Sequence, residues 1–417
     1  MLALFLTFAA LTTQAAVPDS LSPAARRELA DVRYLADDAR QGRGVGTAGL
    51  DSAEAYVARA FAAAGLAPGG DHGSYLQGFV IAPDAPGVMH TNLGGARTAN
   101  VVGILPGSSL TGEIVVIGAH VDHLGMGGTF AMDNPDSTGK PHDGADDNAS
   151  GVAALMEVAR MLGRRHPART VVFIAFSGEE LGDLGSEYYV KHPAPEPIDS
   201  VYAMVNMDMV GRLRNDRLLV LGAATAAEFP ALLDSLNRVA GFDLHASGDG
   251  WGPSDHASFY GAHRPVLHFF TDLHEDYHRT TDRWQKINAP GLARVTDLVA
   301  ATVWSLADRR GSLTFVNAPP PQTSMGGSGY GAYLGTIPDM SESPGGVRIT
   351  GVRSASPAER AGLAGGDVIT AIGAKSVANL YDMTDALRAH QPGDTVVIVV
   401  KRGAQTLRLT TVLGKRS

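Results

Sequence analysis

The sequence predicts an α/β fold with a mixed, mostly parallel sheet covered by helices on both faces, followed by a small β-rich domain. Three observations lead to this prediction. Short runs of β-branched and aromatic residues recur between residues 99 and 272, and helical patterns separate them. Apolar strands that alternate with helices are typical of parallel sheets, because helices bury both faces. A stretch rich in Pro, Gly and Ser, residues 316–329, then precedes a separate strand-and-turn pattern.

Two helices are predicted from the spacing of apolar residues. The first lies within residues 20–70, where Asp51 can cap a helix because Glu54 follows at the spacing of a capping box. Gly65 is expected to end that helix. The second is expected over residues 149–165, whose apolar residues share one face. These residues are Val152, Leu155, Met156, Ala159 and Leu162.

Five strands are predicted from short apolar runs, which are too short for helices and rich in Val, Ile and Phe. The runs are ANVVGIL, EIVVIGAH, TVVFIAFSGEE, VYAMVNMDM and RPVLHFFTD. The chain is therefore expected to divide into an export signal at 1–16, an α/β domain at 17–315, a linker at 316–329 and a β-rich domain at 330–417.

Composition excludes several classes of function. The chain has 417 residues and a net charge of −9, with no run of five basic residues, so nothing indicates nucleic-acid binding. It contains no cysteine, which excludes disulfides, thiol catalysis and Cys-ligated zinc. Any metal ion must therefore be held by His, Asp and Glu.

The N-terminus is expected to be an export signal. Leu2 to Leu11 form an apolar run, and the small residues Ala15 and Ala16 follow it, where we expect cleavage. The run is too short to span a bilayer, and no other segment is expected to do so. No Lys or Arg precedes the run, which departs from the usual pattern. The mature protein is predicted to be periplasmic or secreted.

Acidic and imidazole side chains follow the predicted strands one after another. In open α/β sheets, ligands bind outside the carboxyl ends of the strands, so these side chains should meet at one edge. So many carboxylates would repel one another without a cation. The residues are His120, Asp122, Asp147, Glu179, Glu180, Asp208, His274, His278 and Asp282.

The set of residues fits two zinc ions. Histidine and carboxylate ligands without cysteine suit zinc, and a pair of ions needs one bridging carboxylate and about two further ligands for each ion. Glu179 is then free to act as a general base, and Asp122 can orient the imidazole of His120. The five predicted ligands are His120, Asp147, Glu180, Asp208 and His278.

The motifs resemble those of the secreted co-catalytic zinc aminopeptidases over about residues 30–310. The wider family includes zinc carboxypeptidases and glutaminyl cyclases, and its fold is an αβα sandwich of the phosphorylase/hydrolase-like type. The motifs are QGRGVGTAG, GAHVDHLG, GADDNASGVAALMEVAR, FIAFSGEELGDLGS, NMDMVGR, SDHASF and DYHRTTD. The resemblance implies peptide substrates and two Zn²⁺ ions.

The resemblance also implies roles for single residues. It places the bridging carboxylate on Asp147 rather than on Asp146, which is expected to face backbone or solvent. A strained or cis peptide is expected just after Asp147, with a helix beginning from Asn148. Tyr277 is expected to help stabilise an oxyanion, and Asp255 to position groups near the site. The histidines without a predicted role are His123, His142, His263, His268 and His274.

The C-terminal segment, residues 330–417, resembles a PDZ domain of the type found in exported proteases. The motifs are YLGT, SPAERAGLAGGDVI and MTDALRAH, the last being the helix beside the peptide groove. The resemblance implies that a peptide C-terminus binds near Leu334 and Gly335 and pairs with a sheet edge.

The predicted function is therefore that of an exported, zinc-dependent aminopeptidase with a peptide-binding domain. The alternatives are a glutaminyl cyclase, a carboxypeptidase or dipeptidase on the same scaffold, or a binding protein in which the PDZ domain carries the function and the peptidase domain is silent. The complete ligand set and Glu179 argue against the silent enzyme.

Overall fold

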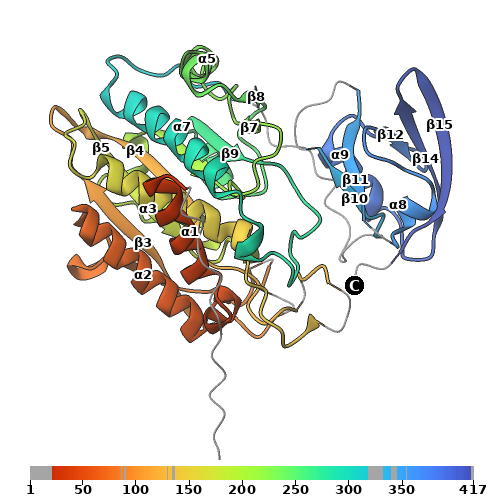
Figure 1. Cartoon of the computed structure of the whole chain (residues 1–417), viewed down its shortest axis with the longest axis horizontal. Coiled ribbons are helices and arrows are strands. Elements are labelled where there is room, and N and C mark those ends of the chain that lie inside the picture. Colours follow the sequence, from red (N-terminus) through yellow and green to blue (C-terminus); the bar gives the residue numbers. More distant parts are fainter. Residues whose placement is uncertain are drawn as a thin grey trace, which may run out of the picture.

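The computed structural model describes residues 21–85, 87–88, 91–128, 130–133, 137–317, 332–339, 345–353 and 355–414. The chain forms a large α/β part and a small β-rich part (Figure 1). The expected signal at residues 1–16 lies outside the described residues, and of the expected linker only residues 316–317 are described. Among the described helices, none combines the length and the apolar character that a membrane crossing requires.

The large part is built on a nine-stranded mixed sheet with the order β1-β3-β5-β4-β6-β9-β7-β8, in which β2 also pairs with β3. The central strands β5, β4, β6 and β9 are parallel, and β3 and β7 join them in antiparallel fashion. The strands are β1 (Ala67–Pro68), β2 (Leu76–Val80), β3 (Arg97–Leu105), β4 (Leu110–His120), β5 (Arg169–Phe176), β6 (Val201–Met207), β7 (Arg217–Leu221), β8 (Asp243–Ser247) and β9 (Val266–Phe270).

Helices cover both faces of this sheet, so the predicted αβα sandwich is confirmed (Figure 1). One layer contains α1 (Pro23–Leu35), α2 (Ala48–Ala64), α3 (Gly151–Leu162) and α7 (Ala289–Asp308), with α5 (Phe229–Ala240) packed against α7. The opposite layer contains α4 (Leu184–Lys191) and α6 (His256–Gly261), which contact each other.

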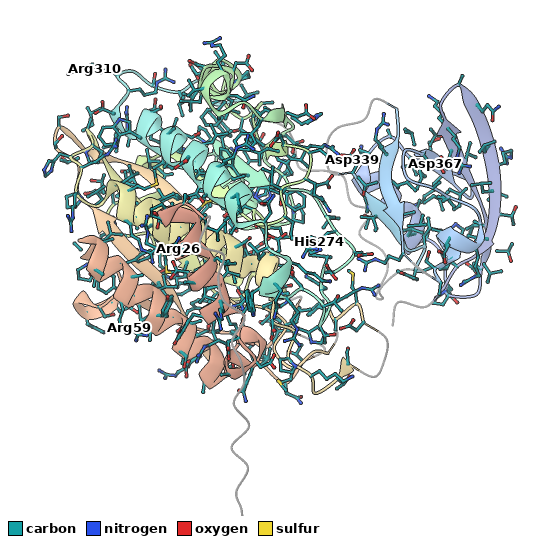
Figure 2. The ribbon with its side chains drawn as sticks, in the orientation of Figure 1. Arg26, Arg59, His274, Arg310, Asp339 and Asp367 are labelled. Carbon is teal, nitrogen blue, oxygen red and sulfur yellow. The ribbon has the colours of Figure 1, made fainter. Side chains whose placement is uncertain are left out.

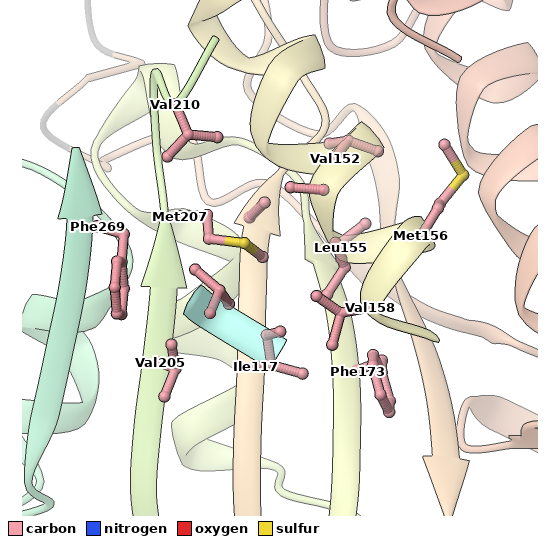
Figure 3. Packing of buried hydrophobic residues seen from close by; sticks show 14 of the residues in the cluster. Ile117, Val152, Leu155, Met156, Val158, Phe173, Val205, Met207, Val210 and Phe269 are labelled. Carbon is pink, nitrogen blue, oxygen red and sulfur yellow. The ribbon is translucent and has the colours of Figure 1, made fainter. Parts of the chain in front are cut away.

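The alternation of side chains along β4 creates two cores. Val115 and Ile117 belong to the large apolar cluster under α3 and α7, whereas Ile114 and Val116 belong to the smaller cluster on the α4 and α6 side. Figure 3 shows Ile117 and its neighbours on adjacent strands beneath the apolar residues of α3. Gly118 faces the second layer, where a Cβ atom would lie 2.3 Å from the ring of Phe176. The sheet is therefore buried on both faces, as the apolar strands predicted.

Two local predictions differ from the structure. The first predicted helix begins earlier than expected, because Thr47 rather than Asp51 is its N-cap and accepts a hydrogen bond from the Leu50 N–H group (3.3 Å). Its predicted end is confirmed, since Gly65 adopts the left-handed conformation (φ 88°). The strands β1, β2, β7 and β8 were not predicted.

The small part has a six-stranded sheet and its own apolar core, and β10 is the terminal strand in the order β10-β11-β12-β14-β15. Its elements are β10 (Thr336–Pro338), β11 (Val347–Val352), α8 (Pro357–Arg360), β12 (Val368–Ile372), β13 (Lys375–Ser376), α9 (Leu380–Arg388), β14 (Thr395–Arg402) and β15 (Gln405–Val412).

Side-chain contacts between described residues join the two parts. Arg217 on β7 pairs with Asp339 just after β10 (2.6 Å), and the Arg353 guanidinium lies 3.1 Å from the Met132 sulfur. Figure 2 shows Asp339 on the side of the small part that faces the α/β part. Arg217 also lies 3.3 Å from Asp272, in the loop that follows β9. The small part therefore contacts loops near the carboxyl edge of the large sheet.

Candidate metal centre

The carboxyl edge of the parallel strands carries the predicted site. His120 is the last residue of β4, and Asp208 follows β6. After β5 the chain turns at Gly178, whose φ of 82° favours glycine, into a short helical turn, Glu179–Leu181. The loop before α3 contributes Asp147, and the loop after β9 contributes His278. Five segments that are distant in sequence thus meet at one edge of the sheet.

The two oxygens of Asp147 face two different sets of ligand atoms. Its Oδ1 lies 3.3 Å from Nε2 of His120, and that nitrogen lies 3.3 Å from Oδ1 of Asp208. Its Oδ2 lies 3.3 Å from Nε2 of His278, and that nitrogen lies 3.0 Å from Oε2 of Glu180. The structure therefore brings all five predicted ligands together, with Asp147 between two imidazole–carboxylate pairs.

The donor set fits two divalent cations. The ligand atoms of His120, Glu179 and Asp208 lie within 4.8 Å of one another, and so do those of His123, Asp147 and Glu180. Within the described residues, Oδ2 of Asp147 and Nε2 of His278 are buried and have no hydrogen-bond partner. Buried polar atoms are normally satisfied, so these atoms point to ligands outside the chain.

Backbone contacts fix the direction of Asp147. The N–H groups of Asp146 and Asp147 both donate to Oδ2 of Asp282 (2.8 and 3.1 Å). The Asp147–Asn148 peptide bond is cis, as expected from the sequence. Asn148 donates to the Met207 carbonyl (3.0 Å) at the end of β6. Asp282 was among the predicted cluster without a role, and the structure gives it this anchoring role.

Asp146 meets the backbone alternative of its prediction, because it is fully buried and accepts a hydrogen bond from a main-chain N–H group. Its Oδ1 accepts hydrogen bonds from the Gly211 N–H group (2.7 Å) and the Ser150 hydroxyl (2.9 Å). Its Oδ2 lies 3.1 Å from Nε2 of His274, which gives that histidine a partner. The helix α3 begins at Gly151 rather than at Asn148, since a wide helical turn, Ala145–Ser150, precedes it.

Asp122 contacts His120 in a different way from that predicted. Its main-chain carbonyl lies 3.2 Å from Nδ1 of His120, whereas its carboxylate lies 3.9 Å away. The carboxylate instead accepts hydrogen bonds from the N–H groups of Glu179 and Glu180 (3.2 and 3.4 Å). Asp122 therefore holds the segment with both glutamates, and its carbonyl is the group within hydrogen-bond reach of the imidazole.

Glu179 and Tyr277 lie at the rim of the cluster. Oε2 of Glu179 is 3.8 Å from Nε2 of His120, farther than the predicted ligands. Burial, opposed by His120 and assisted by Glu180, raises the pKa of Glu179 well above its usual value.

The Tyr277 ring stacks on His278 with 3.9 Å between ring centroids. Burial and the charges of Asp147 and Glu180 raise the pKa of its hydroxyl, which keeps it a hydrogen-bond donor.

His123 is a site residue that the sequence reasoning missed. Its Nδ1 lies 2.6 Å from Oε1 of Glu180 and 3.9 Å from Oδ2 of Asp147. His123 and His278 thus approach Glu180 from two sides, with their rings 5.8 Å apart. The signal available in the sequence was that His123 follows Asp122 directly, in the loop that leaves β4 at the site.

Asp255 lies behind the Asp208 side of the cluster. It precedes α6, is fully buried, and neither of its carboxylate oxygens has a hydrogen-bond partner among the described residues. The adjacent Ser254 hydroxyl donates to Oδ2 of Asp208 (3.0 Å). The structure therefore brings Asp255 near the site, as the sequence predicted for a positioning acid.

Arg43, in the predicted QGRGVGTAG motif, holds the loops around the centre. It is 1% exposed and donates to four main-chain carbonyls. These carbonyls belong to Val121 (2.8 Å), Leu35 (2.9 Å), Asp143 (2.6 Å) and Gly144 (2.9 Å). A single guanidinium thus links α1, the end of β4 and the loop that leads to Asp147.

Replacing Arg43 with lysine is expected to lower the free energy of unfolding by about 3 kcal/mol, because an ammonium group cannot reach four carbonyls and leaves buried acceptors unsatisfied. Urea unfolding measures the change. The exposed Arg59 (Figure 2) provides the control, and Arg59→Lys should change stability by less than about 0.5 kcal/mol. Equal effects of the two substitutions would contradict this role for Arg43.

The predicted PDZ residues lie at the start of β10. Leu334 is buried, and its carbonyl accepts from the Ala358 N–H group (2.8 Å). Gly335 has a φ of 83°, and a Cβ atom there would lie 2.3 Å from Cβ of Ser356. Only glycine fits this turn without displacing Ser356. The turn leads directly into the terminal strand β10, next to which a peptide strand could pair.

Comparison with known proteins identifies both parts of the chain. Residues 100–303 match Peptidase family M28, and residues 332–413 match the PDZ domain. The chain carries an M28 peptidase domain. The M28 domain is followed by a PDZ domain, as the sequence motifs predicted.

Relatives of the M28 domain extend the comparison. Aminopeptidase YwaD of Bacillus subtilis is 28% identical over 215 residues, which cover 49% of this chain and 44% of that protein. The solved structure of the Bacillus subtilis zinc aminopeptidase BSAP covers 68% of this chain and 95% of its own, with a TM-score of 0.54 and 19% identity. A glutaminyl cyclase of Porphyromonas gingivalis covers 67% and 96%, with a TM-score of 0.55 and 20% identity. The structures therefore share the fold with this chain, and the chain spans about half the length of the curated relatives that it matches.

Proposed function

We propose that this protein is a zinc-dependent aminopeptidase that removes N-terminal residues from peptides. The observation that carries the proposal is the position of Asp147, whose two oxygens face the His120–Asp208 pair and the His278–Glu180 pair. A carboxylate between two such pairs is the arrangement that a two-metal hydrolase requires. The name of the curated relative YwaD supports the aminopeptidase class.

Two zinc ions would be held by His120 and Asp208 on one side and by His278 and Glu180 on the other, with Asp147 shared. His123 is a further imidazole donor on the second side. Bound zinc would supply Lewis-acid polarisation of the scissile carbonyl and would lower the pKa of the attacking water.

The remaining groups of the site transfer a proton, stabilise the oxyanion and hold the glutamates in place. The Glu179 carboxylate can accept the proton of the attacking water and pass it to the leaving amine, since it lies at the rim of the cluster. The hydroxyl of Tyr277 can donate a hydrogen bond to the developing oxyanion. The Asp122 carboxylate keeps Glu179 and Glu180 in place through their N–H groups.

A substrate panel tests the proposal. The wild-type protein is expected to hydrolyse amino-acid p-nitroanilides, to leave their N-acetylated forms intact, and to lose activity when a chelator removes the metal. Restoring zinc should restore activity, because the centre lacks cysteine ligands that oxidation could damage. Hydrolysis of blocked substrates would overturn the aminopeptidase assignment, and activity that is indifferent to chelator would overturn the metal assignment.

The same measurements separate the alternatives. A glutaminyl cyclase of the one-zinc branch would bind a single zinc per chain and would cyclise N-terminal glutamine. A carboxypeptidase would accept N-acetylated peptides, and a silent enzyme would bind zinc without turnover. Elemental analysis of zinc per chain, together with the substrate panel, distinguishes these outcomes.

We also propose that the protein is exported and that its PDZ domain binds a peptide or partner C-terminus. The apolar run Leu2–Leu11 supports export, and N-terminal sequencing of the mature protein tests it. The Gly335 turn and the terminal strand β10 support the peptide site. Binding of a peptide with a free C-terminal carboxylate, but not of its amide, would support that assignment.

A further inference from the structure

The backbone of His278, a proposed zinc ligand, lies in a conformation that needs support. Its φ is 57°, in the left-handed region that residues with a side chain rarely adopt. Such a conformation costs free energy and persists only where surrounding contacts hold it. The contacts that hold His278 therefore also set the direction of its imidazole.

A separate loop, residues 130–133, holds His278 at its main chain and at its ring. We call this loop the His278 clamp. The Met132 N–H group donates to the His278 carbonyl (2.8 Å), and Nδ1 of His278 donates to the Phe130 carbonyl (2.9 Å). Because a carbonyl oxygen only accepts, the Nδ1 proton is fixed there, and Nε2 remains as the atom that faces Asp147 and Glu180.

Asp133 joins the end of the clamp to the segment that follows His278. Its Oδ2 accepts a hydrogen bond from the Thr280 N–H group (2.7 Å) and lies 3.2 Å from Nε2 of His142. The clamp thus contacts the main chain at His278 and again just beyond it. A shift of the clamp would therefore move the imidazole relative to the other ligands.

The PDZ domain contacts this clamp through Arg353. The Arg353 guanidinium donates to the Met132 sulfur (3.1 Å). The main chain of Arg353 is fixed as well, because its N–H group donates to the Gly335 carbonyl (2.8 Å) and its carbonyl accepts from the Ser356 N–H group (3.3 Å). A continuous series of contacts therefore leads from the PDZ domain to His278.

A second contact keeps the two domains in place near the same ligand. Asp339, just after β10, pairs with Arg217 (2.6 Å), and Arg217 lies 3.3 Å from Asp272. Asp272 belongs to the loop after β9 that carries His278. Figure 2 shows His274, from the same loop, on the side of the α/β part that faces Asp339. The Arg353 and Arg217 contacts thus both reach segments that support His278.

We propose that Arg353 of the PDZ domain is a positioning residue for His278 and that it acts through Met132 and the His278 clamp. The inference rests on the proposed zinc site. The PDZ domain then supports the metal centre of the M28 domain, in addition to the peptide binding proposed for it. Without the Arg353 contact, the left-handed His278 is held less firmly, and zinc on the His278 side binds more weakly.

Arg353→Gln in the full-length protein tests this assignment, because glutamine is shorter and uncharged and cannot keep the contact with the Met132 sulfur. Arg348→Gln is the matched control, since Arg348 is an exposed arginine on β11 of the same domain. For each protein, chelator competition measures the dissociation constants of the two zinc ions, and thermal unfolding measures Tm. His278→Ala identifies the constant that belongs to the His278 side.

Met132→Leu removes the same contact from the other domain. Leucine lacks the sulfur acceptor but has a similar volume, and it keeps the main-chain N–H group that donates to His278. If Arg353→Gln lowers Tm, Met132→Leu repeats the comparison with an unaltered PDZ domain. The double variant shows whether the two residues act through one contact.

The expected result is a loss of zinc affinity on the His278 side of about 2- to 30-fold in Arg353→Gln and in Met132→Leu, the range for substitutions along a contact network. Zinc on the His120 side should bind as in the wild-type protein, and Arg348→Gln should change neither constant. The double variant should lose no more affinity than the weaker-binding single variant.

Three results overturn the assignment while two zinc ions still bind to the wild-type protein. Arg353→Gln and Met132→Leu could both match Arg348→Gln, or both could weaken the two zinc ions equally, which would be a general loss of stability. Additive losses in the double variant would show that Arg353 does not act through Met132. A wild-type protein that binds no zinc is a different failure, because it overturns the proposed metal centre and this assignment with it.

Discussion

Glu179→Gln is expected to lower kcat for amino-acid p-nitroanilides by about 10²- to 10⁴-fold, which is the usual contribution of a general base. Glutamine has the same shape but cannot accept a proton from the attacking water. The side chain lies 3.8 Å from Nε2 of His120, at the rim rather than between the ligands, so zinc binding should survive. Steady-state kinetics and zinc analysis of the same preparation measure both quantities.

The control for this prediction is Glu180→Gln at the adjacent position. Oε2 of Glu180 lies 3.0 Å from Nε2 of His278 and Oε1 lies 2.6 Å from Nδ1 of His123, inside the ligand set. The Glu180 variant should therefore lose zinc as well as activity. Unchanged peptide hydrolysis in Glu179→Gln would show that the proposed mechanism is wrong, and zinc loss in that variant would make Glu179 a ligand instead of a base.

The central sheet could be predicted from the sequence because fully buried strands consist of continuous apolar runs. β3, β4, β5, β6 and β9 were all identified in this way. β1, β2, β7 and β8 were missed, and all four are short. β8 is the terminal strand and β7 lies between it and β9, so the pairing of β7 depends on contacts with strands that are distant in sequence.

Most of the ligand set could be predicted because its members follow recognisable strands, whereas Asp147 precedes a helix and was singled out by the resemblance. The groups that hold the ligands were harder to predict. Asp282 anchors Asp147 through main-chain N–H groups, and Arg43 anchors the same loop through main-chain carbonyls. Contacts to the main chain leave no pattern in the partner's sequence, so Asp282 was named only as a member of the cluster, and Arg43 was quoted only as part of a motif.

Asp146 and Asp147 also show that residue types alone do not assign roles, here at neighbouring positions. The resemblance to zinc aminopeptidases separated the bridging residue from its neighbour, but the residue types alone could not. The structure separates them physically, because hydrogen bonds from Gly211 and Ser150 occupy Asp146, whereas Oδ2 of Asp147 has no hydrogen-bond partner in the described chain. Substituting each in turn is therefore a sharp comparison.

Asp147→Asn is expected to lower zinc content below two ions per chain and to lower kcat/KM at least about 10³-fold, since several kcal/mol of charge stabilisation depend on the shared carboxylate. An amide carries no negative charge and offers only one oxygen, so it cannot serve both imidazole–carboxylate pairs. Elemental analysis and kinetics with added zinc measure the effect. Zinc that binds the folded state raises its stability, so adding zinc should raise the Tm of Asp147→Asn less than the Tm of the wild-type protein.

Asp146→Asn is the matched control, because it changes the same atom type one residue away. Asparagine can still accept the hydrogen bonds from Gly211 and Ser150 but alters the contact with His274 (3.1 Å), so Tm should fall while two zinc ions remain bound. The two variants should therefore separate stability from metal binding. If Asp146→Asn lost zinc and Asp147→Asn retained it, the bridging role would belong to Asp146. The arrangement of the two imidazole–carboxylate pairs around Asp147 could then no longer support the two-metal proposal.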